Sequence, residues 1–307
     1  MTNYLERVKE EIILNYGVRF FPWQKSKLRA YIKEETNKLG WDSEILKGNI
    51  IVGDIERAEY IYTAHYDTPG KIPEYARFVY KLFGNTSIIL ANLAILMMIL
   101  LYSTLMVIAA NIFGLEHRVD LLASIPYVLL MIGIFIPNKN NYNDNTSGVL
   151  TLMNIAHEIL ELGIDKDKVA FVFFNNEEWG LLGSAAMKKY WKRNRVSLDN
   201  KKLINFDCVG AGGTILITHG KKDEFAKEIQ EKLQESTGIE VNRYKYKVLP
   251  LSDDFTFKNK GAIGIVFSNK SKLGKGYYIP NVHCNKDKYL KLENIEYLTE
   301  EICNLIK

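Results

Sequence analysis

The chain has 307 residues, of which 47% are hydrophobic, and its formal net charge is +4. This content is enough for one large core or two modest ones. The Lys- and Arg-rich pieces are spread along the chain and alternate with apolar residues, as on solvated helix faces, so we expect no nucleic-acid partner. Cys208, Cys284 and Cys303 form neither a CxxC motif nor an even framework, which favours a reducing compartment over a disulfide scaffold.

The first 50 residues predict two leading helices, the second from about Pro22 to Leu39, and then a strand near Asn49–Val52. The opening residues are charged and amphipathic, so we expect no secretory signal. A second strand pattern ends in His65-Tyr-Asp67. Because residues two apart in an extended chain face the same side, Asp67 can lie beside the imidazole of His65 and fix its tautomer. A lone histidine at a strand end is more often an ordinary hydrogen-bonded residue.

An apolar insertion interrupts the sheet pattern. Residues 86–113 form a run of about 28 residues without charge, and residues 121–137 add about 17 more. At 1.5 Å per residue both runs can cross a hydrocarbon core of about 30 Å, the second only just. A pair of buried helices or a hairpin at a dimer contact is the alternative. We expect a transmembrane hairpin, with the lipid bilayer as its partner.

The flanking charges predict the orientation of this hairpin. Arg77 and Lys81 precede the first span and Lys139 follows the second, whereas the connecting link carries only Arg118. Because Lys and Arg concentrate on the cytoplasmic side, this bias of three against one favours a cytoplasmic catalytic domain. Two spans also return the chain to the side it left, so segments before and after the hairpin can meet in one site.

Three further segments offer carboxylates. Asp144 lies in Asn143-Asp144-Asn145-Thr-Ser-Gly148, just before a periodic helix over Val149–Leu162. A role as helix N-cap is the alternative for Asp144, and it does not exclude metal ligation. Asp207 ends a short apolar strand that begins at Leu203, and His283 lies in a loop after a Gly- and Tyr-rich stretch.

Glu177 and Glu178 follow the run 169–176, whose short apolar pattern is typical of a strand buried on both faces. Gly180 and Gly183 allow a tight strand-to-helix turn. Two neighbouring carboxylates held there point in different directions, so one can bind a cation while the other takes a proton, as metal-dependent hydrolysis requires. The alternative is a solvated helix start, where acidic residues favour the helix dipole.

Together these segments supply a set of nitrogen and oxygen ligands with one glutamate, Glu177, to spare. The ligand candidates are His65, Asp144, Glu178, Asp207 and His283. Mixed imidazole and carboxylate ligands suit zinc, with manganese or cobalt as substitutes. Two ions about 3.5–4 Å apart and bridged by one carboxylate would form a co-catalytic pair.

In this order the motifs resemble the co-catalytic zinc aminopeptidases, a clan with bacterial leucyl aminopeptidases, glutaminyl cyclases and transferrin-receptor-like proteins. The matching motifs are His65-x-Asp67, Asn143-Asp144-Asn145-x-Ser147-Gly148, Glu177-Glu178-x-Gly180-x-x-Gly183-Ser184, Asp207 and His283-x-x-x-Asp287. They cover roughly residues 20–70 and 140–307. The resemblance implies an α/β fold whose mixed central sheet is flanked by helices, and a peptide or aminoacyl substrate.

The resemblance also implies roles for these residues. Asp144 would bridge two zinc ions. His65 and Asp207 would complete one site, and Glu178 and His283 would complete the other.

Glu177 would be the general base that activates a water between the metals, and Asp67 would support His65. We expect residues 1–85 and 138–307 to form the catalytic domain and residues 86–137 the hairpin.

Two motifs depart from the family pattern. Where the family often has Ser-Asp-His, this chain has Ser252-Asp253-Asp254-Phe255, and Val282 stands where some members place a tyrosine that steadies the oxyanion. Tyr277 or Tyr278 is a substitute for that tyrosine, although ordinary packing is the favoured role of both. The alternatives to an aminopeptidase are a glutaminyl-cyclase-like acyltransferase with one zinc ion and a catalytically silent receptor or scaffold. The pair of His65 and Asp67 argues for two metals and so for hydrolysis.

Overall fold

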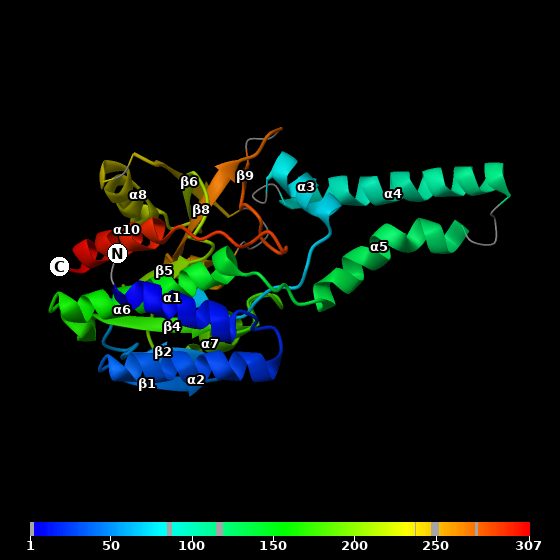
Figure 1. Ribbon diagram of the computed structural model, residues 1–307. Helices are drawn as coiled ribbons and strands as arrows, with labels where there is room; N and C mark the ends of the chain where they lie inside the picture. Colours follow the sequence, from blue (N-terminus) through cyan, green and yellow to red (C-terminus); the bar gives the residue numbers. More distant parts are fainter. Residues whose placement is uncertain (1–2, 85–87, 115–118, 237, 247–251, 274–275) are drawn as a thin grey trace.

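The computed structural model describes residues 3–84, 88–114, 119–236, 238–246, 252–273 and 276–307 (Figure 1). The expected hairpin boundary near residue 86 and the link residues Glu116, His117 and Arg118 lie outside this part of the chain.

A mixed sheet forms the centre of the domain. Within the described residues it has nine strands in the order β1-β2-β4-β3-β5-β8-β6-β7, with β9 paired to β8. The strands are β1 (Ser43–Leu46), β2 (Asn49–Val52), β3 (Tyr60–His65), β4 (Val169–Phe174), β5 (Lys202–Phe206), β6 (Thr214–His219), β7 (Glu240–Lys245), β8 (Ile263–Lys270) and β9 (Tyr277–Tyr278). The neighbours β4, β3, β5 and β8 run parallel, and β2 and β6 join them antiparallel. The expected α/β fold with a mixed sheet is confirmed.

Helices cover both faces of this sheet (Figure 1). They are α1 (Asn3–Tyr16), α2 (Pro22–Lys38), α6 (Ser147–Glu161), α7 (Leu182–Arg193), α8 (Glu224–Ser236), α9 (Asp254–Phe257) and α10 (Leu292–Ile306), with short helical turns at Tyr142–Thr146, Lys166–Lys168 and Lys258–Lys260. Successive side chains of β4 point to opposite faces of the sheet, which explains why helices pack on both faces. Phe171 and Phe173 join the core with α1, α6 and α10, whereas Val172 and Phe174 join the core with α7.

The insertion forms a helical hairpin that projects from the domain on the right of Figure 1. It consists of α4 (Ile88–Phe113) and α5 (Val119–Phe135), and α3 (Glu74–Phe83) lies at its base. By length and composition, the segment Leu90–Phe113 of α4 is long and apolar enough to cross a membrane. Only 11% of its apolar stretch is buried against the rest of the protein. The second helix is equally apolar in character but has 17 residues. Within the described residues, one helix rather than the expected two is therefore long and apolar enough to span a membrane.

Backbone contacts hold the two ends of the insertion together. Gly70 and Pro137 form an isolated antiparallel bridge, and the N–H of Lys71 donates to the carbonyl of Gly133 at 2.8 Å. A Cβ atom at Gly70 would collide with the carbonyl of Ile134, so only glycine fits this close approach. We call these two paired segments, residues 70–71 and 133–137, the neck.

Candidate metal centre

Three strand ends meet at one edge of the sheet. His65 is the last residue of β3, Asp207 follows the last residue of β5, and Glu177 and Glu178 come shortly after β4. These strands are parallel neighbours in the order β4-β3-β5. Their carboxyl ends therefore bring the four side chains together, as sites in such sheets require.

The turn Tyr142–Thr146 carries Asp144 to the same edge. The side chain of Asn145 donates to the carbonyl of Phe206 at 3.0 Å and accepts from the N–H of Cys208 at 3.1 Å. These bonds attach the Asp144 turn to the end of β5. A Cβ atom at Gly148 would collide with the carbonyl of Phe206, so the glycine of this motif permits the close approach.

The Asp144 turn is also held by Asp287. Its carboxylate accepts from the backbone N–H groups of Asn143 at 2.9 Å and Asp144 at 3.0 Å. Burial raises the pKa of Asp287 to about 7. The N-cap of α6 is Thr146, so Asp144 does not cap that helix. The sequence placed Asp287 in a motif without assigning it this positioning role.

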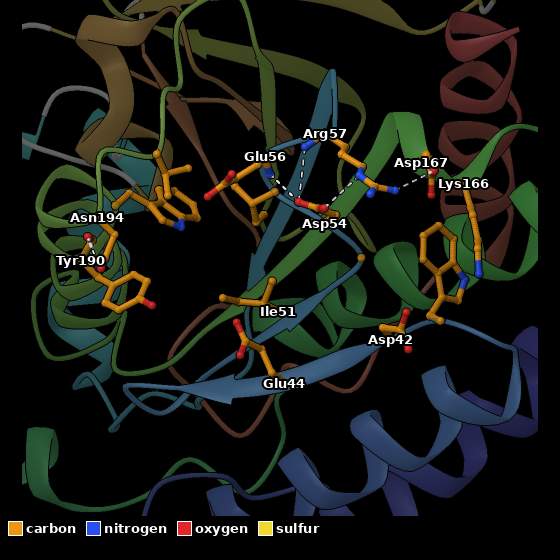
Figure 2. A pocket seen from close by; sticks show the side chains of 15 residues that line it. Asp42, Glu44, Ile51, Asp54, Glu56, Arg57, Lys166, Asp167, Tyr190 and Asn194 are labelled. Atoms are coloured by element: carbon orange, nitrogen blue, oxygen red, sulfur yellow. Dashed lines mark hydrogen bonds and ion pairs between the residues drawn. The ribbon is translucent and has the colours of Figure 1, made fainter.

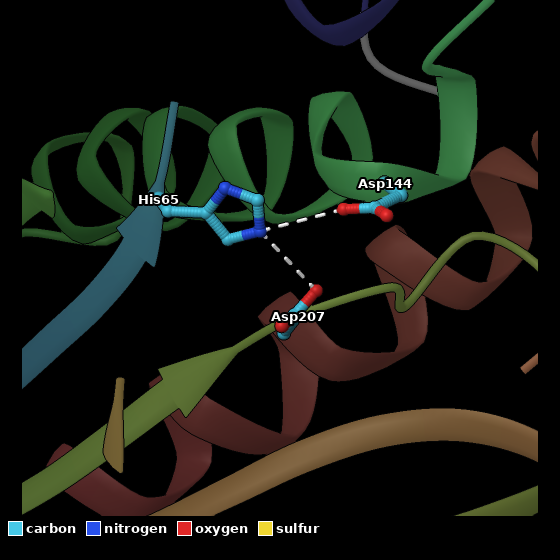
Figure 3. Close-up of side chains that lie close together, drawn as sticks. All are labelled: His65, Asp144 and Asp207. Carbon is cyan, nitrogen blue, oxygen red and sulfur yellow. Dashed lines mark ion pairs between the residues drawn. The ribbon is translucent and has the colours of Figure 1, made fainter. Parts of the chain in front are cut away.

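Asp144 lies between two histidines. The Nε2 atom of His65 is 3.4 Å from Asp144 Oδ1 and 3.6 Å from Asp207 Oδ1 (Figure 3). The Nε2 atom of His283 is 3.2 Å from Asp144 Oδ2 and 3.5 Å from Glu178 Oε2. The two oxygens of one carboxylate thus face two different groups of ligand atoms.

Each of these groups has the size of a metal site. The candidate ligand atoms of His65, Asp144 and Asp207 lie within 4.8 Å of one another, as do those of Asp144, Glu178 and His283. His65, Glu177 and Glu178 form a third group of this size. The structure therefore brings together all of the ligand residues that the sequence suggested.

The electrostatics of this centre favour a bound cation. Burial raises the pKa of Glu177 and Glu178 well above the usual range, and neighbouring carboxylates add to the effect. Burial also opposes ionisation of Asp144, but hydrogen bonds with His283 and His65 outweigh it and hold its pKa below the usual range. A cation would offset the repulsion among these acids.

Two buried carboxylate oxygens point to the same conclusion. Within the described residues, Glu178 Oε1 and Asp207 Oδ1 have no hydrogen-bond partner, although buried polar atoms are nearly always partnered. Imidazole nitrogen and carboxylate oxygen are ligands that zinc accepts. The residues present therefore fit a zinc site.

Asp67 connects the histidine with the glutamate pair. One carboxylate oxygen lies 3.6 Å from His65 Nδ1, and the closer partner of that nitrogen is the backbone carbonyl of Asp67 at 3.2 Å. The carboxylate also accepts from the N–H groups of Glu177 at 3.0 Å and Glu178 at 3.3 Å. Asp67 thus lies beside His65, as its spacing suggested, and additionally orients both glutamates.

The glutamates do not begin a helix. Helix α7 starts at Leu182, and both acidic residues lie in the loop between β4 and α7. Gly183, the second residue of α7, permits a close approach, because a Cβ atom there would collide with the carbonyl of Asn175. The alternative of a solvated helix start is therefore wrong, because the pair faces the other candidate ligands.

Sequence reasoning assigned no role to two buried charged residues near this centre. Arg19 is fully buried, and its guanidinium donates to the carbonyl of Tyr66 at 2.8 Å and to Thr146 Oγ1 at 3.0 Å. Burial lowers the pKa of Arg19 to about 10 while nearby acids oppose that shift. Asp253 is also fully buried, and burial raises its pKa to about 7. The sequence did offer one indication of a buried charge, because Arg19 lies in the otherwise apolar stretch after Gly17.

The two tyrosines considered for the oxyanion lie in different surroundings. Tyr277 packs against the cluster of Cys208, Leu216 and Val266, which agrees with an ordinary packing role. Tyr278 lines a cavity of about 650 Å³ that His283 also lines. This cavity lies between α3 and the loop of His283.

A larger cavity of about 860 Å³ lies elsewhere, lined by residues of β1, β2, the loop after β2 and α7 (Figure 2). Arg57 pairs there with Asp54 and Asp167, both at 3.4 Å. None of the candidate metal ligands lines it. The smaller cavity is therefore the better candidate for substrate.

Comparison with protein families agrees with this geometry. The model of peptidase family M28 matches residues 136–300, more than half of the chain. The chain belongs to peptidase family M28. The match begins at the end of the hairpin and includes Asp144, the glutamate pair, Asp207 and His283. A search of curated proteins found no match.

Solved structures share the M28 fold at low sequence identity. The LapA aminopeptidase of Legionella pneumophila is 12% identical with a TM-score of 0.65, covering 99% of this chain and 70% of that one. A Zn-dependent exopeptidase from Parabacteroides distasonis is 15% identical with a TM-score of 0.60, covering 98% and 96%. A Bacteroides thetaiotaomicron glutaminyl cyclase bound to N-acetylhistamine is 15% identical with a TM-score of 0.57, covering 98% and 95%. The suspected family and its zinc-peptidase fold are confirmed.

Proposed function

We propose that this M28 protein is a membrane-anchored, zinc-dependent aminopeptidase that hydrolyses N-terminal peptide bonds. The observation that carries the proposal is the carboxylate of Asp144, whose two oxygens face His65 at 3.4 Å and His283 at 3.2 Å. Residues 1–85 and 138–307 would form the catalytic domain and residues 86–137 the hairpin. A shared carboxylate between two ligand groups is the arrangement that two-metal hydrolysis uses.

The proposed centre holds two zinc ions, with Mn²⁺ or Co²⁺ as substitutes. Asp144 would contact both ions, His65 and Asp207 would hold one, and Glu178 and His283 would hold the other. Such a pair would polarise the scissile carbonyl and lower the pKa of water. Asp67 would fix the imidazole of His65 by accepting at its Nδ1 side.

Glu177 is the proposed general base. It lies beside Glu178 in the loop that Asp67 orients. Among the described residues Glu178 forms an ion pair with His283 and Glu177 forms none, which leaves the Glu177 carboxylate available for proton transfer. Its carboxylate would take a proton from the attacking water and return it to the leaving amine. Burial raises the pKa of Glu177, which brings it closer to the range useful for proton transfer.

A glutaminyl-cyclase-like acyltransferase is the second candidate function. The glutaminyl cyclase of Bacteroides thetaiotaomicron shares the fold over 95% of its length. A single zinc ion would favour this second activity, whereas the His65–Asp67 pair supports two. A catalytically silent receptor or scaffold is the third candidate, and the presence of Glu177 with every ligand candidate argues against it.

The test of function is a substrate screen. Zinc-loaded protein is assayed with aminoacyl and dipeptide substrates and with N-terminal glutaminyl peptides, and Glu177→Gln serves as the control for contaminating peptidases. We expect release of free N-terminal amino acids by wild type and not by the variant. Cyclisation of glutaminyl peptides without hydrolysis would favour the cyclase, and inactivity in both assays would favour the scaffold.

The proposed membrane topology has both termini and the catalytic domain in the cytoplasm. Exposure of α4 supports a span there, and α5 would return the chain. Single cysteines at Glu116 in the link and Lys222 in the domain, on a background without native cysteines, are labelled in intact cells by an impermeant reagent. We expect labelling only at Glu116. Labelling only at Lys222 would invert the topology.

A further inference from the structure

The four tryptophans of the chain fall into two pairs. Trp41 and Trp191 are buried in the domain, with exposed fractions of 3% and 2%. Trp23 and Trp179 have exposed fractions of 59% and 41%. Tryptophan is costly to leave in water, so two exposed tryptophans call for an explanation.

The exposed pair belongs to one continuous row of rings. Trp23 stacks on Phe21 with ring centroids 4.5 Å apart, and Phe21 contacts Phe20 at 5.1 Å. Phe20 contacts Trp179 at 5.7 Å, and Trp179 contacts Phe135 at 6.2 Å. We call these five residues the aromatic row.

The aromatic row joins the hairpin to the candidate metal centre. Phe135 is the last residue of α5, and Trp179 directly follows the candidate ligand Glu178. At the other end, Trp23 lies in the first turn of α2. The row therefore runs from the foot of the hairpin, past the candidate centre, onto the surface of the catalytic domain.

The other foot of the hairpin carries cations around the smaller cavity. Arg77, Lys81 and Lys286 line this cavity together with Glu74, which leaves an excess of positive charge. The backbone N–H of Ile72, just before α3, donates to the carbonyl of His283 at 3.0 Å. The second foot of the hairpin thus also reaches the candidate centre.

These features fit the boundary of a bilayer. Tryptophan rings concentrate at the membrane–water interface, and Lys and Arg near the cytoplasmic leaflet attract anionic lipids. The aromatic row is continuous with α5, and the neighbouring helix α4 exposes apolar side chains along a length that matches the hydrocarbon core. Because the aromatic row continues directly into the foot of the hairpin, the lipid–water interface is the partner that this surface fits.

We propose that the exposed rings of the aromatic row, Trp23, Trp179 and Phe135, rest in the membrane interface, so that the catalytic centre opens at the level of the lipid headgroups. The substrate class is then a peptide whose N-terminus lies at the membrane surface, such as the end of a membrane-bound segment, rather than a freely diffusing peptide. This inference rests on the proposed hairpin span and peptidase activity.

Tryptophan fluorescence tests the position of the row without any assay of activity. The full-length protein is reconstituted into phosphatidylcholine vesicles that carry nitroxide labels either at the headgroup or near the end of the acyl chain. We expect stronger quenching by the headgroup label. The double variant Trp23→Phe with Trp179→Phe should lose this quenching, whereas the matched variant Trp41→Phe with Trp191→Phe should keep it.

Two results would overturn the inference on its own. Protein that stays with the vesicles but shows no quenching has its aromatic row in water. Equal loss of quenching in both double variants would mean that Trp23 and Trp179 lie no closer to the lipid headgroups than the buried tryptophans do. Protein that leaves the vesicles without detergent would instead overturn the proposed hairpin span, and the inference with it.

A kinetic comparison tests the substrate class. One peptide is assayed free in solution and with an acyl chain at its C-terminus that anchors it in the same vesicles. We expect kcat/KM to be at least tenfold higher for the anchored peptide, and Trp23→Ser should reduce this ratio. The control is Leu162→Ser, an exposed leucine at the far end of α6 that should leave the ratio unchanged.

The outcomes separate the two proposals. Hydrolysis of both peptides at equal rates would overturn the substrate class and leave the peptidase intact. Hydrolysis of neither peptide, with quenching as expected, would overturn the peptidase activity on which the substrate class rests.

Discussion

The α/β domain and the hairpin use the same apolar side chains in opposite surroundings. Leu28, Phe171 and Ile295 are buried against other apolar groups in the domain, whereas Leu96 and Leu101 on α4 are exposed along an uncharged helix. Burial of apolar area stabilises a fold in water, so the domain supplies its own core. Among the described residues of the hairpin region, apolar packing forms only a small cluster of Ala91 and Ile95 on α4 with Ala76 and Val79 on α3.

The two regions also differ in where they keep charge. The domain buries Asp144, Asp253 and Asp287 around the candidate metal centre, at a cost that a cation and hydrogen bonds can offset. The described part of α4 contains no charged side chain at all. Substitutions that remove the same number of atoms in the two regions should therefore differ strongly in their effects on metal content, activity and stability.

The largest expected effect comes from Asp144→Ala. This change removes a carboxylate that faces both ligand groups, so we expect nearly complete loss of zinc and of activity. The control is Asp120→Ala at the start of α5, an exposed carboxylate that should keep both. Elemental analysis of detergent-purified protein measures zinc per chain, with two ions expected for wild type. One ion or fewer after full reconstitution would speak against the paired centre.

The next effect is that of Glu177→Gln. Glutamine keeps the shape but cannot accept the proton, so activity should fall by about 10²–10⁴-fold while zinc and fold remain. Glu161→Gln at the end of α6 is the control. If activity stays near that of wild type, Glu177 is not the base, and loss of zinc would show that Glu177 and Glu178 have exchanged roles.

Matched Leu→Ala changes test the comparison of the two regions directly. Leu28→Ala in α2 should lower the free energy of unfolding by about 2–5 kcal/mol, because it opens a cavity in the core. Leu96→Ala on the exposed surface of α4 should cost less than about 1 kcal/mol, since about half of this residue, 52%, is already exposed. Unfolding by denaturant in detergent measures both. Equal losses would indicate a packed hairpin instead of one that faces lipid.

A pH-dependent effect is expected at Asp254, which accepts from Thr218 Oγ1 at 2.8 Å and Tyr246 OH at 2.9 Å. Burial raises its pKa to about 8, against about 4 in an unfolded chain. The folded protein thus holds this proton more tightly, and its contribution to stability is lost as the pH rises from about 4 to about 8.

Asp254→Asn removes that ionisation. We expect the variant to gain stability over wild type as the pH rises from about 4 to about 8, and to gain nothing at pH 4. Thermal unfolding at the two pH values measures the difference. A variant that is less stable at pH 8 than at pH 4, relative to wild type, would mean that Asp254 is ionised in the folded protein.

Much of the fold and the centre was predictable because the relevant patterns are local. The apolar run of β4, the periodicity of α6 and the carboxylates at strand ends can all be read from short segments. The roles of Asp287 and Arg19 were not predictable, since they depend on contacts with residues more than 100 positions away, Asp144 and Thr146. The close approach of Gly183 to the carbonyl of Asn175 was not predictable either, because it depends on how the loop after β4 folds back.

The neck also determines how the hairpin is joined to the domain. Because Gly70 and Pro137 pair with each other, the hairpin enters and leaves the domain at nearly one point, as a surface loop does. A hairpin attached in this way can be inserted into an M28 domain as a single loop, without rearranging the strand ends that position His65 and Asp207. The same geometry makes the neck a natural place to graft a different anchor onto this domain, or to transfer this one to another peptidase.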